Sequence, residues 1–585
     1  MQYVLILFEG LLLAVLLVLA LIHSRAIIRI TQPFASAFRW FSRLRVACIV
    51  LCAALPLVIR LAILPSLGMR APKTHDEFAQ LLQAETFAQG RLTTPSPVLP
   101  HHFESVHVSV TPSYFSKYPP AKAAMLALGQ RLWGHPWWGA WLSVGLMCAA
   151  VCWMLQRWLP PGWALLGGLL VAARLGIFSY WMNSYWGGAI PAAAGALVLG
   201  AARGVLRADR ERPPPVSDVL LMVIGAVVLA NSRPFEGLIL CGAVGLLVLI
   251  ALFRARIALR VVALRVALPA LLVLVPAAAV MGRYHAALTG SPTLLPYELN
   301  SAQYRMGGQF IWSPPKPERA YRHGHLVRFY ARESETQLSK RSITAMPRHL
   351  GALVTKSWLF YIAPALTLAL FAAPRLLRGR RTRPLLLSAA AVGAGLAANA
   401  FFIPHYAAPI LAAMVALLVQ GLRYLRQWHW RGSPVGMALV RGIPAVILLT
   451  VTARFALPPR VTAALSEYPL TWFWTDPGGT ERAWILETFE ERPRRHLLLV
   501  DYDESASHHS EWVYNGAEIR TQHVVWARSL SPEQNAELIR HFPDRTPWLM
   551  VISGKGNEIW PYYPNEKEAE PQRQGAPVMA QRAAP

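Results

Sequence analysis

The sequence predicts an all-α polytopic membrane protein that carries a small α/β domain towards its C-terminus. Three observations predict it. Of the 585 residues 54% are hydrophobic and only 15% are charged, apolar runs of membrane-spanning length recur along the chain, and a C-terminal stretch changes to a strand-like pattern. A soluble chain of this length would instead show several domains built from amphipathic helices.

The apolar runs predict about 12 transmembrane helices, because each run of roughly 17 to 23 residues is long enough to cross the hydrocarbon core. We interpret the first run as an uncleaved span, since it has no basic residues before it and no small-residue cleavage pattern. The expected helices lie near residues 2–22, 46–66, 137–156, 162–179, 187–203, 217–232, 235–253, 266–283, 351–373, 385–402, 405–422 and 441–457.

Short arginine-rich loops between these runs orient the chain. Six loops contain 23 arginines, against which stand only Asp209 and Glu211. This is the positive-inside bias of cytoplasmic loops, so it explains the net charge of +26 without a nucleic-acid partner. We expect a multi-pass protein of the bacterial cytoplasmic membrane. The loops lie at about 23–45, 157–162, 203–216, 254–265, 374–384 and 423–441.

With those loops inside, both termini face the extracytoplasmic side. We expect a transmembrane domain over residues 1–457, with two large outside loops at 67–136 and 284–350. Residues 458–556 then read as an extracytoplasmic α/β domain, because alternating β-branched runs flank a helix that Ser531 can cap. The polar, proline-rich tail 557–585 is expected to be disordered.

The first outside loop begins with the charged stretch "KTHDEF", directly after the second apolar run. Thr74 followed by Glu77 forms a capping-box pattern, and Gly90 is a helix stop signal. Phe78 and Leu82 supply an apolar face that we expect to lie on the membrane surface. Helix architecture therefore explains much of Glu77, but it explains less of Asp76.

The rest of this loop favours chemistry. It contains Glu85, Glu104, Lys117 and Lys122 besides Asp76. Carboxylates at a membrane surface can accept a proton from a hydroxyl or hold a divalent cation, and lysines can stabilise a departing phosphate. The combination indicates a membrane-surface transferase whose donor carries a phosphate.

Three histidines of the same loop allow a metal site by residue type. His101, His102 and His107 lie around Glu104, and imidazole and carboxylate are common ligands of zinc and related metals. Their spacing matches no helical ligand motif, so surface histidines are the alternative. A divalent metal ion as cofactor is left open.

The acidic pair resembles the motif of the GT-C superfamily of membrane glycosyltransferases, which includes protein O-mannosyltransferases and lipid A aminoarabinose transferases. Members carry an Asp-Glu motif early in the first large outside loop, where this chain has Asp76 and Glu77. The aminoarabinose transferases also carry Lys-Pro-Pro further along; "SKYPP" is similar, but Tyr118 is inserted after Lys117. The resemblance implies a polyprenyl-phosphate sugar donor and catalysis by Asp76 and Glu77, with Asp76 as general base.

Other outer-surface residues are candidates for binding. Arg233 can bind the donor phosphate or simply anchor at the interface and pair with Glu236. His405 lies at a helix end where GT-C proteins often contact the donor. We assign donor phosphate binding to Lys117, Arg233, Arg305 and His405, and acceptor or sugar binding to Glu85, Glu104, Tyr118, Tyr304 and Tyr406.

The aromatic segment "FSYWMNSYWGGAIP", residues 178–191, has two interpretations of equal weight. Its Trp and Tyr side chains can form an ordinary interfacial belt, or they can form a wall of the pocket for the lipid-linked sugar.

The predicted function is transfer of a sugar from a polyprenyl-phosphate donor to a hydroxyl of a lipid, glycan or protein acceptor. A transporter or lipid flippase is the alternative. Transporters usually place essential charges near the bilayer midplane, whereas the charges singled out here lie outside the apolar runs. A non-catalytic scaffold for the C-terminal domain is a third reading.

Overall fold

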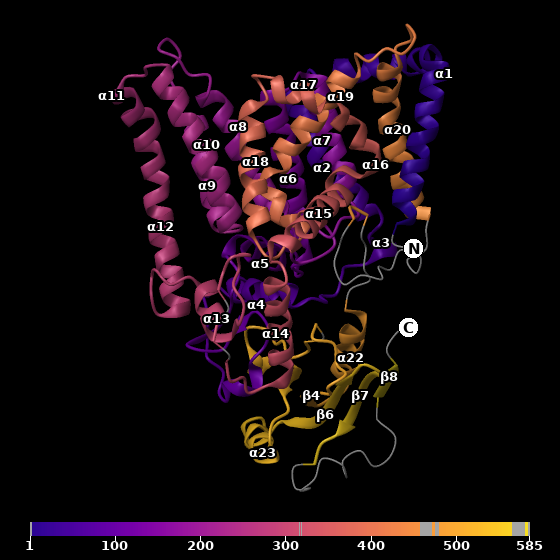
Figure 1. Cartoon of the computed structure of the whole chain (residues 1–585). Coiled ribbons are helices and arrows are strands. Elements are labelled where there is room, and N and C mark those ends of the chain that lie inside the picture. Colours follow the sequence, from indigo (N-terminus) through magenta and orange to yellow (C-terminus); the bar gives the residue numbers. More distant parts are fainter. Residues whose placement is uncertain are drawn as a thin grey trace. The chain divides into compact units, whose positions relative to one another are not determined.

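The computed structural model describes residues 3–314, 316–317, 319–456, 471–473, 479–509, 511–563 and 579–582 (Figure 1). The chain divides into two compact units, each assembled from three separate stretches of sequence. Unit 1 comprises Met1–Met69, Trp137–Ala279 and Ile343–Pro477, and unit 2 comprises Arg70–Pro136, Val280–Ser342 and Gly478–Pro585.

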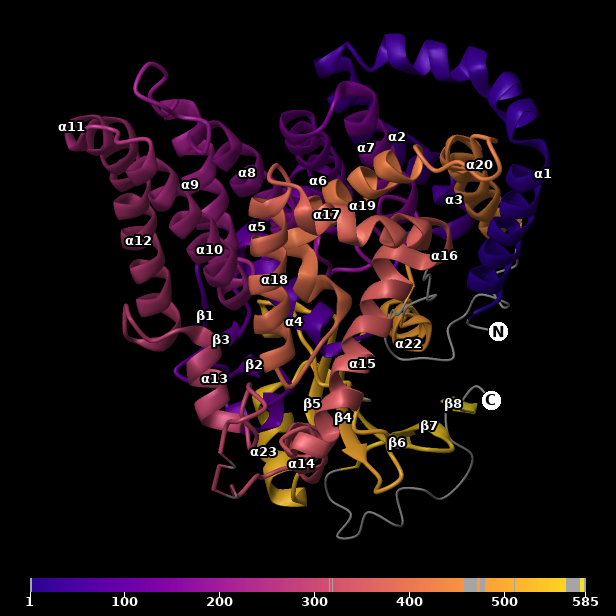
Figure 2. The ribbon, with the colours of Figure 1, turned by 45° about the horizontal axis from the view of Figure 1, so that its top comes forward.

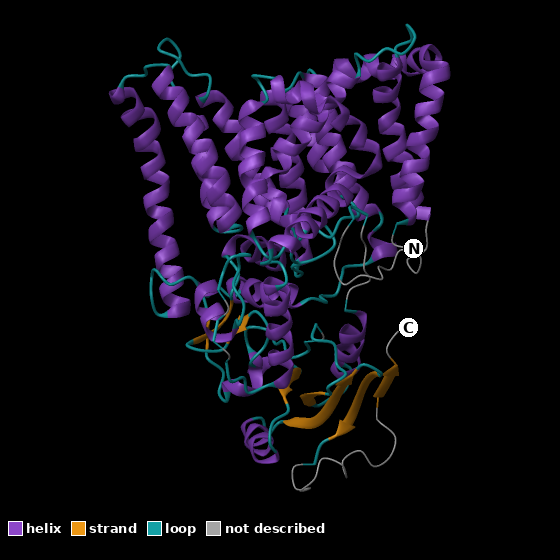
Figure 3. Cartoon of the chain, viewed as in Figure 1, coloured by secondary structure: helices purple, strands orange, loops and turns teal. Residues whose placement is uncertain are grey.

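Unit 1 is helical, as Figure 3 shows by colour, and its helices follow the apolar runs of the sequence. Among the described residues, eight helices are long and apolar enough to cross a membrane, and four shorter apolar helices accompany them. The chain is therefore a multi-pass membrane protein, and the predicted helical fold class is confirmed. The eight candidate spans are Val4–Phe41, Arg45–Ala62, Trp137–Trp158, Pro234–Arg254, Leu259–Thr289, Ile343–Arg378, Pro404–Leu425 and Val435–Ala456.

Unit 1 contains most of the helices of the chain, and the last residues of α12 belong to unit 2. The elements of unit 1 are α1 (Val4–Phe41), α2 (Arg45–Ala62), α3 (Leu64–Leu67), α6 (Trp137–Trp158), α7 (Pro161–Leu175), α8 (Ala189–Val205), α9 (Val216–Ala230), α10 (Pro234–Arg254), α11 (Leu259–Val262), η2 (Ala263–Ala267), α12 (Leu268–Thr289), η3 (Ile343–Ala345), α15 (Met346–Ser357), η4 (Trp358–Ile362), α16 (Ala363–Thr367), η5 (Leu368–Ala372), α17 (Ala373–Arg378), α18 (Arg383–Ala398), η6 (Pro404–Ile410), α19 (Leu411–Leu425) and α20 (Val435–Ala456).

Two sequence predictions for unit 1 are wrong in detail. The arginine-rich stretch expected as a loop at 23–45 is mostly helix, because α1 bends at His23 and continues to Phe41. The span expected at 351–373 is interrupted: π and 3-10 turns follow α15, and Ala363 has a positive φ of 49°. Proline follows Ala363 directly, and the residue before a proline is disfavoured in the α conformation, which accounts for the break.

The aromatic segment between α7 and α8 is buried within unit 1 instead of lying in an interfacial belt. Tyr180, Trp181, Tyr185 and Trp186 are each at most 5% exposed. Trp181 is packed closely around Gly188, where an added Cβ would come within 2.6 Å of the indole ring. The belt interpretation is therefore corrected, because these rings fill the interior of the helical unit.

Unit 2 contains a five-stranded sheet in its described part, in the order β5-β4-β6-β7-β8. β4 runs parallel to β5 and β6, whereas β7 and β8 add antiparallel partners. This confirms the predicted α/β character of the C-terminal stretch. The elements are α22 (Thr480–Glu490), β4 (Arg495–Tyr502), η7 (Ile519–Thr521), β5 (Val524–Arg528), α23 (Pro532–His541), β6 (Arg545–Ser553), β7 (Gly556–Pro561) and β8 (Met579–Arg582).

The sheet extends beyond residue 556, where the sequence pattern placed the end of the domain. β7 continues to Pro561 and pairs with β6 and β8, so the disorder expected over 557–585 does not hold for those two strands. Residues 564–578 and 583–585 of that expected tail lie outside the described residues. The helix start at Ser531 is confirmed, because its hydroxyl accepts a hydrogen bond from the Gln534 N–H.

The two outside loops supply the remaining elements of unit 2. A small antiparallel sheet of order β1-β3-β2 lies in the first loop together with two helices that pack on each other, α4 and α5. The elements are α4 (His75–Ala88), β1 (Thr94–Pro95), η1 (Pro100–Phe103), β2 (Val108–Ser109), β3 (Ser113–Ser116), α5 (Pro120–Trp133), α13 (Pro296–Tyr304) and α14 (Gly324–Leu338).

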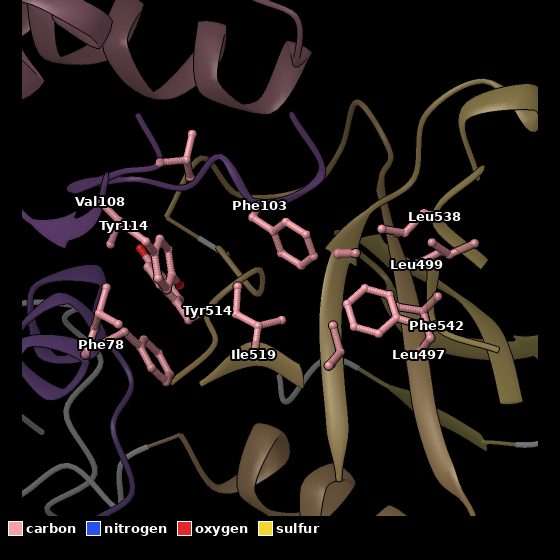
Figure 4. Close-up of a cluster of buried hydrophobic side chains, with 14 of the residues drawn as sticks. Phe78, Phe103, Val108, Tyr114, Leu497, Leu499, Tyr514, Ile519, Leu538 and Phe542 are labelled. Atoms are coloured by element: carbon pink, nitrogen blue, oxygen red, sulfur yellow. The ribbon is translucent and has the colours of Figure 1, made fainter. Parts of the chain in front are cut away.

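One hydrophobic core joins the first loop to the C-terminal sheet (Figure 4). Phe78 and Leu82 of α4 are buried in this core with Leu497 and Leu499 of β4. The membrane-surface interpretation of the α4 face is therefore wrong for Phe78 and Leu82. The intervening residue Leu498 faces a second core on the other side of the sheet, as the two-residue period of a strand requires.

Candidate active site

Local sequence fixes the start and end of α4. Thr74 is the N-cap, and Glu77 Oε2 accepts hydrogen bonds from the backbone N–H groups of Lys73 and Thr74 at 2.9 and 3.1 Å. The helix ends at Ala88, and Gly90 then adopts a positive φ of 75°, a conformation that glycine adopts without strain. The predicted capping box is confirmed.

Glu77 is buried and engaged at this helix start. Burial lowers the pKa of Lys122, on the neighbouring helix α5, to about 7, and the negative charge of Glu77 acts in the opposite direction. Glu77 therefore serves the architecture of α4 and α5. Its predicted catalytic role stays a prediction.

Asp76 is placed differently, because it is half-buried and its carboxylate faces the end of β3. The Tyr118 hydroxyl donates a hydrogen bond to Asp76 Oδ1. The backbone carbonyl of Tyr118 accepts a hydrogen bond from Gln83 Nε2 at 3.1 Å, and the same amide group donates to the Tyr284 hydroxyl at 2.5 Å. Tyr118 is thus held from both ends beside the carboxylate.

Two cations, Lys117 and Arg305, lie near Asp76 and Tyr118. The Lys117 ammonium lies 5.4 Å from the centroid of the Tyr118 ring and 5.3 Å from that of Tyr297. Arg305 donates to the Tyr297 hydroxyl at 2.8 Å and pairs with Glu333 at 3.1 Å. The structure therefore brings Asp76, Lys117, Tyr118 and Arg305 to one place in unit 2.

Burial lowers the pKa of Lys117 to about 8. This value includes the charge of Arg305, which also lowers the pKa, and the carboxylates of Glu333 and Asp76, which raise it. Lys117 is therefore cationic at neutral pH, while a modest rise in pH removes its proton. A group of this kind is suited to meeting a negative charge that forms during a reaction.

Three histidines, His75, His107 and His509, pack together beside Tyr118. The His75 ring lies 5.5 Å from the rings of His107 and His509, and the His107 ring lies 5.8 Å from that of Tyr118. Burial lowers the pKa of His75 to about 3 and holds that of His107 well below its usual value. These two imidazoles are consequently neutral.

The histidines considered as metal ligands do not meet. His101 contacts Arg322, His102 Nδ1 lies 2.8 Å from the carbonyl oxygen of Arg528, and Glu104 pairs with His323. Among the described residues, no group of three His, Cys, Asp or Glu side chains could hold a metal ion. His101, His102 and Glu104 therefore do not form a common metal site, and a divalent metal ion as cofactor stays a prediction.

Three of the residues predicted to bind the acceptor or the sugar make other contacts: Glu85, Glu104 and Tyr304. Glu104 is engaged with His323 at 3.1 Å, and Tyr304 is buried with its ring stacked on Tyr330 at a centroid distance of 6.2 Å. Burial raises the pKa of Glu85, which lies against the backbone at Gly516. The structure does not bring these three residues to Asp76 through any contact described for them.

A second cluster of predicted residues lies in unit 1. The Arg233 guanidinium lies 3.7 Å from the centroid of the Tyr406 ring, and Arg233 pairs with Glu236 at 3.1 Å. The Tyr180 hydroxyl lies 2.9 Å from His405 Nδ1 and accepts a hydrogen bond from the His405 backbone N–H at 3.0 Å. Arg233, His405 and Tyr406 are therefore gathered with the buried aromatic segment.

Sequence reasoning missed several residues. Glu333 and Tyr297 carry no local signal, because their role depends on Arg305 and Lys117. Glu9 and Arg174 form a buried ion pair between two helices of unit 1, although an isolated glutamate or arginine inside an apolar run is a signal that sequence can show.

We compared the chain with protein-family models, curated proteins and solved structures. A scan against protein-family models found no match, and a search of curated proteins found none. Solved structures similar to the chain include ArnT from Cupriavidus metallidurans bound to undecaprenyl phosphate. It is 12% identical with a TM-score of 0.47, and the similarity covers 85% of this chain and 92% of that one.

Another similar structure is the oligosaccharyltransferase AglB from Archaeoglobus fulgidus, in complex with an inhibitory peptide and a dolichol-phosphate. It is 12% identical with a TM-score of 0.42, and the similarity covers 88% of this chain and 70% of that one. ArnT and AglB are both members of the GT-C superfamily.

Proposed function

We propose that the protein is a glycosyltransferase that moves a sugar from a polyprenyl-phosphate donor to an acceptor hydroxyl at the outer face of the cytoplasmic membrane. One observation carries the proposal. Asp76 stands where the GT-C acidic motif is expected. Its carboxylate accepts a hydrogen bond from the Tyr118 hydroxyl, and the Lys117 ammonium lies against the ring of the same tyrosine. The Tyr118 side chain therefore contacts both the proposed base, Asp76, and a cation, Lys117.

In the proposed reaction Asp76 is the general base. Its carboxylate takes the proton of the acceptor hydroxyl as the oxygen attacks the anomeric carbon of the sugar. The new bond joins the acceptor oxygen to that carbon, and the bond between the carbon and the phosphate oxygen breaks with inversion. The electron pair leaves with the polyprenyl phosphate, whose negative charge a cation must stabilise.

Lys117 is the cation of unit 2 that suits this charge, and Arg305 is held behind it by Glu333 and Tyr297. Phosphate binding by Arg233 and His405 stays a prediction; in unit 1 they lie against half-buried Tyr406 and buried Tyr180, respectively.

The test is an assay of the purified full chain with polyprenyl-phosphate sugars and candidate lipid, glycan and peptide acceptors, comparing wild type with Asp76→Asn. We expect transfer by the wild type and a fall of about 10²- to 10⁴-fold in the variant, as for loss of a general base. Asp544→Asn, at an exposed aspartate of the C-terminal domain, is the matched control. Equal transfer by Asp76→Asn and wild type would reject the base.

A specific observation favours one second candidate, a transporter or lipid flippase. Glu9 and Arg174 form a buried ion pair inside unit 1, and Glu9 Oε1 also accepts the Ala365 N–H at 2.9 Å. Charges buried within spans often belong to transport pathways. If proteoliposomes moved fluorescent lipid in a way that Glu9→Gln abolished, and no sugar transfer were found, this second function would replace the first.

A further inference from the structure

The C-terminal domain touches α4 at three successive positions, beginning next to Asp76. His509 Nδ1 lies 3.4 Å from His75 Nε2, and the two imidazoles stack with centroids 5.5 Å apart. His75 is the first residue of α4 and directly precedes Asp76. The first contact therefore acts on the turn of helix that carries the proposed base.

The second contact is an aromatic stack. The rings of Phe78 and Tyr514 are nearly parallel, at an interplanar angle of 9° and a centroid distance of 4.6 Å (Figure 4). Arg482 covers the other side of this pair, with its guanidinium 4.7 Å from the Phe78 centroid and a 2.7 Å hydrogen bond to the Tyr514 carbonyl. Phe78 lies two residues after Asp76 and is buried.

The third contact lies towards the end of the helix. A Cβ added at Gly516 would come within 2.2 Å of Glu85 Oε2, so the end of the Glu85 side chain lies directly against this glycine. From His75 to Glu85 the helix rises by about 15 Å. His509 and the segment Glu511–Ala517 thus accompany α4 over most of its length.

This segment is itself fixed on the sheet. Asn515 exchanges two hydrogen bonds with Trp526 of β5, at 2.7 and 2.9 Å. Glu511 accepts hydrogen bonds from the Val513 N–H and the Tyr502 hydroxyl and pairs with buried Arg528. Because these hydrogen bonds fix the segment to the sheet, the sheet determines where the segment contacts α4.

We infer that His509 and the segment Glu511–Ala517 are a positioning element of the Asp76 site, so that the C-terminal domain is required for efficient catalysis. The inference rests on the proposed function for its catalytic part. The segment acts through α4: it sets where Asp76 stands relative to Tyr118 and Lys117. Sugar transfer is sensitive to such placement, because a displacement of about 1 Å can lower a rate about 100-fold.

The experiment compares two variants that each remove a buried aromatic ring from the C-terminal domain. Tyr514→Ala removes the ring that stacks on Phe78, whereas Phe489→Ala removes a ring from the core on the opposite face of the sheet. Tyr514→Phe keeps the stack and loses only the hydroxyl that donates to the Val106 carbonyl. All three are made in the full-length protein.

Two readouts are measured, amide hydrogen exchange of the 73–88 peptide and the kinetics of transfer. For Tyr514→Ala we expect faster exchange in α4 and a fall in kcat of about 10- to 100-fold with little change in KM, because placement and not binding is lost. Tyr514→Phe should restore most of both. Phe489→Ala should leave exchange in α4 and kcat near wild type.

Unchanged exchange in α4 for Tyr514→Ala would overturn the inference, and so would an equal effect of Phe489→Ala. If the wild type transfers no sugar, the proposed function fails, but hydrogen exchange still decides whether the segment positions α4. The two failures are therefore distinguishable.

A separate observation carries an inference about the second half of α1, which bends at His23 and runs at an angle to the first half (Figure 2). At 100° per residue its surface divides into three faces. Ile27 and Ile28 pack towards α20, and Arg441 donates to the Ile28 carbonyl at 2.8 Å. Its two outer faces differ in chemistry: one is apolar, formed by Ile30, Phe34 and Trp40, and the other is basic, formed by Arg25, Arg29 and Arg39.

We propose that this half of α1 lies in the membrane interface and binds anionic lipid headgroups. Its three outer apolar residues are 66% to 77% exposed, and a helix with such a face beside an arginine face is the kind that inserts among headgroups. No acidic residue occurs between Glu9 and Asp76. The charge therefore complements anionic lipid and offers nothing to a cationic partner.

The test counts lipids retained by the detergent-purified full chain in native mass spectrometry, with phosphatidylglycerol against phosphatidylcholine. Replacing Arg25, Arg29 and Arg39 by Gln should lower retained phosphatidylglycerol severalfold and leave phosphatidylcholine unchanged. The control replaces the exposed Arg378, Arg380 and Arg381. Equal loss in both triple variants, or no preference for the anionic lipid in the wild type, would overturn the proposal.

Discussion

The Tyr118 hydroxyl donates a hydrogen bond to the carboxylate of Asp76, and these two residues come from opposite ends of the first outside loop. Tyr118 is the residue by which "SKYPP" departs from the Lys-Pro-Pro element of the aminoarabinose transferases. Because of this inserted tyrosine, the proposed base accepts a hydrogen bond from a hydroxyl. The Lys117 ammonium lies over the ring of the same tyrosine.

Tyr118→Phe should lower kcat by about 10- to 100-fold, because a hydrogen bond to a charged group contributes about 1.5–3 kcal/mol. The phenylalanine ring keeps its contacts with Lys117 and His107, so folding should be unaffected. Steady-state kinetics of transfer measures the effect. Tyr297→Phe, which removes a hydroxyl bound to Arg305 instead, is the control and should change kcat less.

Transfer should fall as the pH rises through about 8, because the lowered pKa of Lys117 makes it cationic below that pH and neutral above it. Lys117→Arg keeps a positive charge over this whole range. Its pH–rate profile should therefore lose the decline above pH 8, whatever its absolute rate. Identical alkaline limbs in wild type and Lys117→Arg would show that another group titrates there.

Glu77 should affect stability more than chemistry. Glu77→Ala removes the carboxylate that accepts the N–H groups of Lys73 and Thr74, and loss of helix-cap interactions costs about 0.5–2 kcal/mol. The thermal midpoint should fall in Glu77→Ala and stay near wild type in Asp76→Asn. The reverse order of the two midpoints would contradict the division of roles between these neighbours.

Gly516→Ala should destabilise the protein by about 1 kcal/mol, the low end of the usual cost of overpacking, because the new methyl group meets only the end of the flexible Glu85 side chain. The double variant Glu85→Ala/Gly516→Ala removes the colliding carboxylate and should recover much of the loss. A double-mutant cycle on chemical denaturation measures this coupling. Gly324→Ala, whose added Cβ would have its nearest neighbour at 3.9 Å, is the control and should change little.

Patterns local in the sequence determined much of the fold. The apolar runs follow the helices of unit 1, since a helix that crosses a bilayer satisfies its own backbone hydrogen bonds and needs only apolar side chains. The capping box at Thr74 and the cap at Ser531 were likewise readable, because each involves residues three apart. This local pattern also singled out Asp76, because the capping box does not require a carboxylate at that position.

Only the tertiary structure decided which side chains meet. The partners of Asp76 come from the segment that follows β3 and, through Lys117 and Tyr297, from the second outside loop, and no periodicity connects residues that far apart. Sequence placed Phe78 on a membrane surface because an apolar helix face does not identify what covers it. The cover is Tyr514, over 400 residues away, since burying an aromatic ring depends on close packing and not on distance along the chain.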